Sequence, residues 1–264
     1  MARSKTGGGT GTNQYQIKPS NTAKRTPGLL SGQAAVSPIL ASSQRHWQAI
    51  PPDVRKRIRL ATDSGDTTIL QVLASDGDPV VRRRLAQNGR TPPDVLVSLA
   101  RDPDNMVRHA LSKRPDLPVQ AVVILARDRL RPIRCHAVSH PLLPTVELRR
   151  AMIDPQGQVR IAATRNPNCS PLMLARLSTD TVSQVRAAVG MRKETPVEIL
   201  ETLAKDAKLA VRQAVAGNPS TPPETLVLLA ADSSDLVANK ARKRLMTRKD
   251  VPEHLRAVVA LAGL

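Results

Sequence analysis

The sequence predicts an all-α solenoid built from two-helix repeats of 26 residues. Three observations carry this prediction. A Val or Ile followed by Arg recurs every 26 residues, an Asp stands six positions before each of these arginines, and the apolar residues within a unit are spaced i, i+3 and i+4. Each helix therefore has one apolar stripe, and a fixed period of this length is typical of solenoids, whose repeats bury their cores against neighbouring repeats.

Residues 1–44 are expected to form a disordered basic tail. The segment is rich in Gly, Ser, Thr, Asn and Pro, contains several Lys and Arg, and has no Asp or Glu. It can bury too little apolar surface to offset the entropy lost on ordering. No Gly-Lys-Ser/Thr follows the cluster at Gly7–Gly11, so a phosphate-binding loop is less favoured than a basic arm that tethers to phosphates or a featureless linker.

Residues 45–65 are predicted to form an N-terminal capping half-repeat. Trp47 is the large aromatic residue available to cover the first apolar face, and Val54-Arg55 repeats the Val-Arg pair one residue out of register. End repeats need an altered sequence because they would otherwise expose an apolar face. For the same reason residues 247–264, where the register slips after Arg244, are predicted to form a C-terminal capping helix.

Residues 66–246 are expected to hold the repeats, each with two short helices. The first helix begins at sequences such as Thr91–Asp94, where Thr would be the N-cap, Pro the first helical residue and the acid a partner for the positive helix end. The second helix ends at Asn88, Asn166 or Asn218, where Asn would adopt the left-handed conformation. Helices this short are unstable alone, so stability must come from packing between neighbours.

These motifs resemble those of leucine-rich repeat variant proteins and, more distantly, HEAT-like α-solenoids. The shared features are Asp-x5-Arg with Val before the Arg, and Asn-Pro-x-x-Pro-Pro-Glu-x-Leu between helices, over roughly residues 66–245. The resemblance implies a right-handed superhelix of paired short helices, one of them of 3₁₀ type, and a binding surface rather than an active site. One such protein carries an iron–sulfur cluster in a Cys-rich N-terminal segment. Residues 1–134 here contain no Cys, so we expect no such cofactor.

The recurring Asp and Arg residues are interpreted as a structural ladder. Each Asp would cap a second helix, and each Arg would reach the Asp of a neighbouring repeat. A row of arginines for phosphate binding is the alternative, disfavoured because Asp accompanies Arg so regularly. The ladder consists of Asp76, Arg82, Asp102, Arg108, Asp128, Arg134, Asp154, Arg160, Asp180, Arg186, Asp206 and Arg212.

The remaining positive charge suggests a binding surface for a polyanion. The formal net charge is +18, which favours nucleic acid, membrane phosphates or an acidic protein as partner. With Phe absent and single Trp and Tyr residues, contact with duplex phosphates is expected rather than base stacking. A solvated surface and an acidic protein bound in the superhelical groove remain alternatives. The candidate nucleic-acid-binding residues, all central and outside the ladder, are Lys113, Arg114, Arg129, Arg131, Arg149, Arg150 and Arg165.

We expect no metal, cofactor or catalytic centre. Cys135, His136 and His140 suggest a metal site, but His136 shares the register of inward-pointing alanines and no acid completes a ligand set. A core histidine with a backbone partner is favoured, and Cys169 is expected to be a small residue at an N-cap position. No Ser/His/Asp, Cys/His or carboxylate-pair arrangement recurs outside the capping positions, so we expect a non-enzyme.

The two cysteines are 34 residues apart and do not suggest a disulfide framework. No apolar stretch near Met1 is typical of a signal peptide, and no apolar run is long enough to span a membrane, so we expect neither a signal peptide nor a membrane span. An intracellular, cytoplasmic location is therefore expected.

Overall fold

The computed structural model describes residues 53–261, and all regular structure in this part of the chain is α-helical. The expectations for the tail at residues 1–44 and for Trp47 lie outside the described residues. Among the described helices, none combines the length and the apolar character needed to cross a bilayer.

Two kinds of helix alternate along the chain, as the 26-residue period predicts. The first helices are α3 (Thr67–Leu73), α5 (Pro93–Leu99), α7 (Val119–Ala126), α9 (Thr145–Ala151), α11 (Pro171–Leu177), α13 (Val197–Leu203) and α15 (Pro223–Ala230). The second helices are α4 (Pro79–Gln87), α6 (Asn105–Ser112), α8 (Arg131–Ser139), α10 (Gly157–Arg165), α12 (Ser183–Met191), α14 (Leu209–Gly217) and α16 (Asp235–Thr247). The stack is completed by α2 (Val54–Asp63), which packs on α3 and α4, and by α17 (Glu253–Leu261), which packs on α15 and α16.

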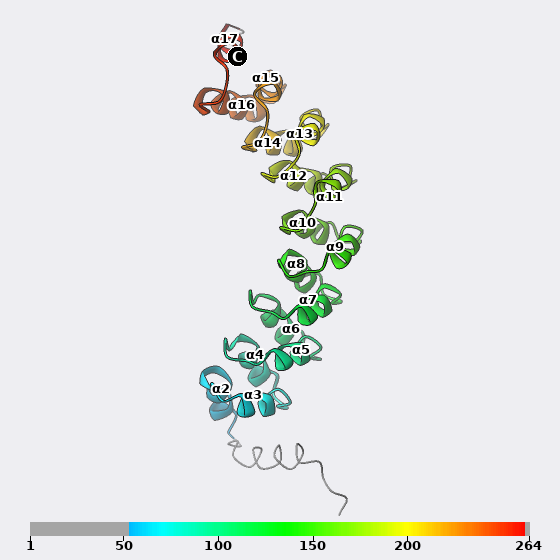
Figure 1. Cartoon of the computed structure of the whole chain (residues 1–264), viewed down its shortest axis with the longest axis vertical. Helices are drawn as coiled ribbons and strands as arrows, with labels where there is room; N and C mark the ends of the chain where they lie inside the picture. Colours follow the sequence, from blue (N-terminus) through cyan, green and yellow to red (C-terminus); the bar gives the residue numbers. More distant parts are fainter. Residues whose placement is uncertain (1–52, 262–264) are drawn as a thin grey trace, which may run out of the picture. The chain divides into compact units, whose positions relative to one another are not determined.

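The second helices stack directly on one another from α2 to α16, whereas the first helices lie on the other side of the described stack and contact one another less (Figure 1). The fold is therefore an all-α solenoid in which each repeat contacts chiefly its neighbours. We call the outward sides of α4, α6, α8, α10, α12, α14 and α16 the second-helix face, and those of the odd-numbered helices the first-helix face.

The core is a column of aliphatic side chains that repeats with the helices. The β-branched residue before each ladder arginine is at most 1% exposed, and these residues are Val81, Val107, Ile133, Val159, Val185 and Val211. Val237 continues the column in α16, where Ala238 replaces the arginine. Leu side chains of the first helices, such as Leu99 and Leu148, pack against the same column. Short helices are thereby stabilised by the interior that successive repeats share.

The first helices begin one residue later than the sequence suggested. Thr91 is not the N-cap, because that position is held by Pro92. The buried Thr91 hydroxyl instead donates to the carbonyl of Leu85 at 2.7 Å, and Thr195 and Thr221 make the same contact six residues back, at 2.6 Å each. The threonine therefore fastens the first helix to the preceding second helix. The buried Cys169 stands in this register, one residue before the N-cap Ser170.

Two further local expectations are wrong. The first helices are α-helical rather than 3₁₀, although their ends tighten, as where the Asp102 amide donates to the Leu99 carbonyl at 3.1 Å. The asparagines that end the second helices are extended rather than left-handed, and Asn88 has φ −73° and ψ 119°. The side-chain amide of Asn88 donates to the carbonyl of Ala61 in the preceding repeat, and this hydrogen bond explains why asparagine stands at this position.

Candidate functional site

Each ladder arginine joins two repeats. Arg108 donates from Nε to a carboxylate oxygen of Asp128 at 2.6 Å and from Nη1 to the main-chain carbonyl of Asp102 at 2.7 Å. The same two contacts recur at Arg82, Arg134, Arg160, Arg186 and Arg212, whose Nε–carboxylate distances span 2.6–2.9 Å. The series ends at Asp232, and at the other end Arg57 pairs with Asp76.

The ladder aspartates hold the turn that leads into each second helix. The Asp206 carboxylate accepts the amide of Lys208 at 2.8 Å. Lys208 is the N-cap residue of α14, so Asp206 lies two residues before the N-cap and not at it. The hydrogen bond from Arg186 is the main reason that the pKa of Asp206 lies below its usual range, and Arg212 acts in the same way on Asp232. Both side chains of each pair are mostly buried, so these arginines hold adjacent repeats together and are not free to bind a ligand.

A second ladder, which residue-type comparison did not reveal, runs along the other ends of the second helices. Its members stand 26 residues apart and each donates from its side chain to main-chain carbonyls of the preceding repeat. Asn166 Nδ2 contacts the carbonyls of Val138 at 2.7 Å and His140 at 2.9 Å. The members are Asn88, Arg114, His140, Asn166, Arg192, Asn218 and Arg244.

Arg114 must therefore be removed from the candidate binding surface. Its side chain is 8% exposed, Nη1 donates to the Ala86 carbonyl at 3.0 Å and to the Asn88 carbonyl, and Nε donates to Asp116 at 2.9 Å. The guanidinium donates to main-chain carbonyls of the preceding repeat, as the side chains of the asparagines in its register do. What the residues of this register share is a side chain that donates to the main chain of the preceding repeat, and not a residue type.

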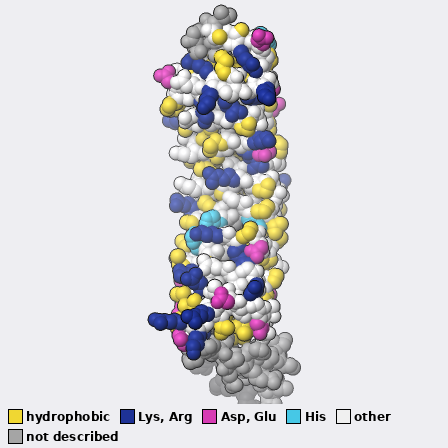
Figure 2. All heavy atoms as spheres, turned by 90° about the vertical axis from the view of Figure 1, so that its left-hand side faces the viewer, with side chains coloured by type: hydrophobic (Ala, Val, Ile, Leu, Met, Phe, Trp, Pro, Cys, Tyr) yellow, Lys and Arg dark blue, Asp and Glu magenta, His cyan; other side chains and the backbone are white. Residues whose placement is uncertain are grey.

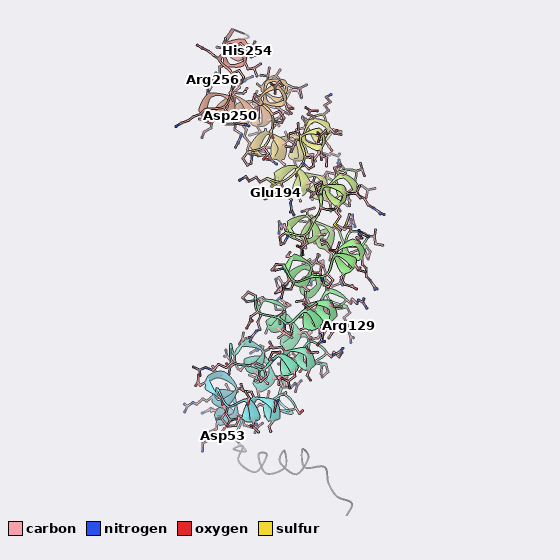
Figure 3. All side chains as sticks on the ribbon, viewed as in Figure 1. Asp53, Arg129, Glu194, Asp250, His254 and Arg256 are labelled. Atoms are coloured by element: carbon pink, nitrogen blue, oxygen red, sulfur yellow. The ribbon has the colours of Figure 1, made fainter. Side chains whose placement is uncertain are left out.

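The other six candidate residues are exposed but lie on different sides of the stack. Lys113 and Arg165 occupy the same register, at the ends of α6 and α10. Arg149 and Arg150 lie on α9, and thus on a first helix. Arg129 precedes α8 and projects on the side of the first helices, while Arg131 is the first residue of α8 (Figure 3). The structure does not gather the predicted residues into one surface.

The second-helix face is nevertheless strongly asymmetric in charge. The six second helices from α4 to α14 contain no Asp or Glu, whereas the first helices α5, α9, α13 and α15 all do. Figure 2 shows Lys and Arg side chains along this side of the stack with few acidic ones. The exposed cations that α4, α6, α10 and α16 contribute, counting the residue directly after α6, are Arg84, Lys113, Arg165, Lys240 and Lys243.

A pair of histidines lies within this face. The rings of His109 and His136 are 5.4 Å apart, and His136 Nδ1 lies 3.0 Å from the Ser112 hydroxyl. Burial, with the His109 and Lys113 charges, lowers the pKa of His136. His136 is thus half-buried with a side-chain partner rather than a backbone partner, and His140 ends α8 instead of lying on it. Within residues 53–261 no group of His, Cys, Asp and Glu is arranged to hold a metal ion.

The comparisons with known proteins agree with the repeat architecture. The family model described as leucine rich repeat variant matches residues 209–234. A solved structure described as a leucine-rich repeat variant with a novel repetitive protein structural motif is similar with 26% identity and a TM-score of 0.54, covering 78% of this chain and 82% of that one. No curated protein matches this sequence. Both similarities concern a repetitive scaffold fold rather than an enzyme family.

Proposed function

We propose that this chain, a repeat protein of the leucine-rich repeat variant type, is a non-catalytic scaffold whose second-helix face binds the phosphate backbone of nucleic acid. The single observation that carries the proposal is the absence of acidic residues from α4, α6, α8, α10, α12 and α14, together with exposed cations on the same side. Among the described second helices α16 alone carries an acid, Asp235, so this face has an excess of positive charge. Such an excess raises the local concentration of an oppositely charged polymer.

The cations of this face are available to a ligand. Arg84, Lys113, Arg165, Lys240 and Lys243 make no ion pair with any carboxylate of the described residues. The ladder arginines, by contrast, are neutralised by their aspartates. Contact with phosphates is therefore expected from the irregular cations and not from the regularly spaced arginines.

The expected mode of binding follows from the side chains that are absent from this face. None of the described second helices contains Phe, Tyr or Trp, so stacking on bases has no platform there. Lys113 and Arg165 are two repeats apart, which corresponds to about 20 Å at the usual spacing of packed helices. A rigid row of this kind fits a duplex backbone, and the affinity should fall steeply with salt and vary little with base sequence.

The test is a salt titration of duplex DNA and RNA binding with two matched double variants. Lys113→Ser with Arg165→Ser places in both positions the residue that Ser139 already provides in the same register. Arg149→Ala with Arg150→Thr removes the same charge from α9, using the residues found at Ala175 and Thr202. The first variant should lower the slope of log affinity against log salt by about 2, because each lost phosphate contact contributes about 0.9.

The α9 variant should leave this slope unchanged, and both variants should keep the wild-type melting temperature. Equal slopes for wild type and the second-helix variant would contradict the proposal. The absence of duplex or single-strand binding even at low salt would also contradict it, and would favour the scaffold binding an acidic protein instead.

A further inference from the structure

The most exposed large apolar side chains of the described residues gather in the central first helices. Leu172 is 82% exposed, Val146 73% and Ile153 65%, and all three lie on α9, on α11 or in the turn after α9. Scattered exposed apolar residues are ordinary, but a cluster rimmed by polar groups marks an interaction surface. We call Val146, Arg150, Ile153, Leu172 and Arg176 the α9–α11 patch.

Comparison with the other repeats shows that these apolar residues are departures from the local pattern. The register of Val146 and Leu172 holds polar residues elsewhere, namely Asp94, Gln120, Glu198 and Glu224. An acid in the first turn of a helix is favourable, so replacing it with Val or Leu does not serve helix stability. Ile153 stands where other repeats have Arg101, Arg127, Thr179 and Lys205. The fold does not require an apolar residue at any of the three positions.

Arginines accompany the apolar residues at helical spacing. Arg150 follows Val146 by four residues, and Arg176 follows Leu172 by four, so each pair lies on one side of its helix. Both arginines are exposed and pair with no carboxylate in the described part of the chain. The nearby Glu147 is buried and occupied by Arg127. In α13 the corresponding stretch carries Glu198 and Glu201 instead.

The surface beside the patch is also hollowed. A pocket between α7 and α9 is lined by Ala126, Arg150 and Ile153 above the Arg134–Asp154 ion pair. In the equivalent pocket two repeats earlier, Ser98 and Arg101 take the places of Arg150 and Ile153. The central pocket therefore has an isoleucine where the earlier pocket has Arg101, and a guanidinium where the earlier pocket has Ser98.

We propose that the α9–α11 patch docks a protein segment in which apolar side chains alternate with carboxylates, as on an acidic amphipathic helix. The apolar residues would bury against Val146, Ile153 and Leu172, and the carboxylates would pair with Arg150 and Arg176. A second copy of the chain is a poor occupant, because the same patch on both copies would bring arginines next to arginines. Residues 1–52 are also a poor occupant, because they contain no Asp or Glu to pair with these arginines. The inference goes beyond nucleic-acid binding and concerns the opposite face.

The probe is a synthetic amphipathic peptide with Leu at i and i+4 and Glu at the remaining exposed positions, measured by calorimetry at physiological salt. The test variant is Val146→Gln with Leu172→Glu, which introduces residues already present in the same register at Gln120 and Glu198. It should bind about tenfold more weakly, or weaker still, at an unchanged melting temperature, because burying one Leu or Val contributes about that much. Leu236→Glu on α16, 62% exposed, is the charge-matched control and should keep wild-type affinity.

A second variant tests the charged half of the patch. Arg150→Thr with Arg176→Thr, which copies Thr202 in the same register, should weaken peptide binding and reduce its salt dependence. Equal binding of a scrambled peptide, or an affinity that neither double variant changes, would overturn the proposal. If the chain self-associates and Leu172→Glu abolishes this self-association, the proposal is overturned and the occupant of the patch is a second copy of the chain. If Leu172→Glu instead abolishes duplex binding, the proposal is overturned and the patch binds nucleic acid.

Discussion

Arg108 and Asp128 form a mostly buried ion pair between successive repeats, with Nε 2.6 Å from the carboxylate and side chains 7% and 5% exposed. The same arginine holds the carbonyl of Asp102, so one guanidinium fastens the turns that enter two adjacent second helices. Repeats of this kind are stabilised by their interfaces with neighbours. The ladder is therefore the polar counterpart of the aliphatic column beside it.

Asp128→Ala should destabilise the protein by about 3 kcal/mol, because it leaves the Arg108 guanidinium buried without a charge partner. The measurement is chemical denaturation followed by circular dichroism. Glu201→Ala, on the exposed side of α13, is the control and should change stability by less than about 0.5 kcal/mol. A similar effect of both substitutions would show that the pair adds nothing to the interface.

The acid stability of the protein should depend on the ladder aspartates. Asp206 and Asp232 have pKa values below their usual range because Arg186 and Arg212 donate to them. Their contribution is complete above the unfolded-state pKa of about 3.9 and is lost as the pH falls through the lower folded-state pKa. Asp206→Asn should therefore flatten the fall in stability below about pH 4. Denaturation curves that fall equally in both proteins would refute this role.

Arg114 provides a test of the second ladder. Arg114→Asn keeps a donor for the Ala86 and Asn88 carbonyls, as Asn does at Asn166, and should cost less than about 1 kcal/mol. Arg114→Leu leaves both carbonyls unsatisfied and should cost about 2–3 kcal/mol. Thermal unfolding compares the two. Duplex affinity should be the same in the Asn variant as in wild type, and a loss there would return Arg114 to the binding surface.

The histidine pair should make stability depend on pH near neutrality. Burial lowers the pKa values of both His109 and His136. A lowered pKa means that the unfolded chain takes up protons first, so stability is complete above about pH 6.5 and declines as the pH falls toward the folded-state pKa. His136→Ala, which copies Ala162 in the same register, should reduce this decline. An unchanged difference in melting temperature between about pH 8 and pH 5 would exclude the pair as its source.

The fold was predictable because its determinants repeat in residue type. The Val–Arg pair and the Asp six residues before it recur with little variation, and the structure turns each into a core residue and an inter-repeat contact. The second ladder was not predictable in this way. Asn166, Arg192 and His140 share only a side chain that donates to a carbonyl, so their common period is hidden when residues are compared by type.

The candidate surface was less predictable for a geometric reason. Arg149 and Arg150 lie only two repeats after Lys113, but the helix pairs place them on the opposite face. The numbers of Lys, Arg, Asp and Glu in the sequence show an excess of positive charge but not which face of the stack carries it. The absence of acids from the second helices could have been noticed from the sequence once the helices were delimited, and it is the better signal.

The most direct test of the account is a lysine acylation footprint, read by mass spectrometry, with and without duplex DNA. Lys113 and Lys243 lie in one register of the second-helix face, whereas Lys205 follows a first helix. The account predicts that duplex protects Lys113 and Lys243 and leaves Lys205 as reactive as in the free protein. Protection of Lys205 with Lys113 and Lys243 unprotected would contradict it.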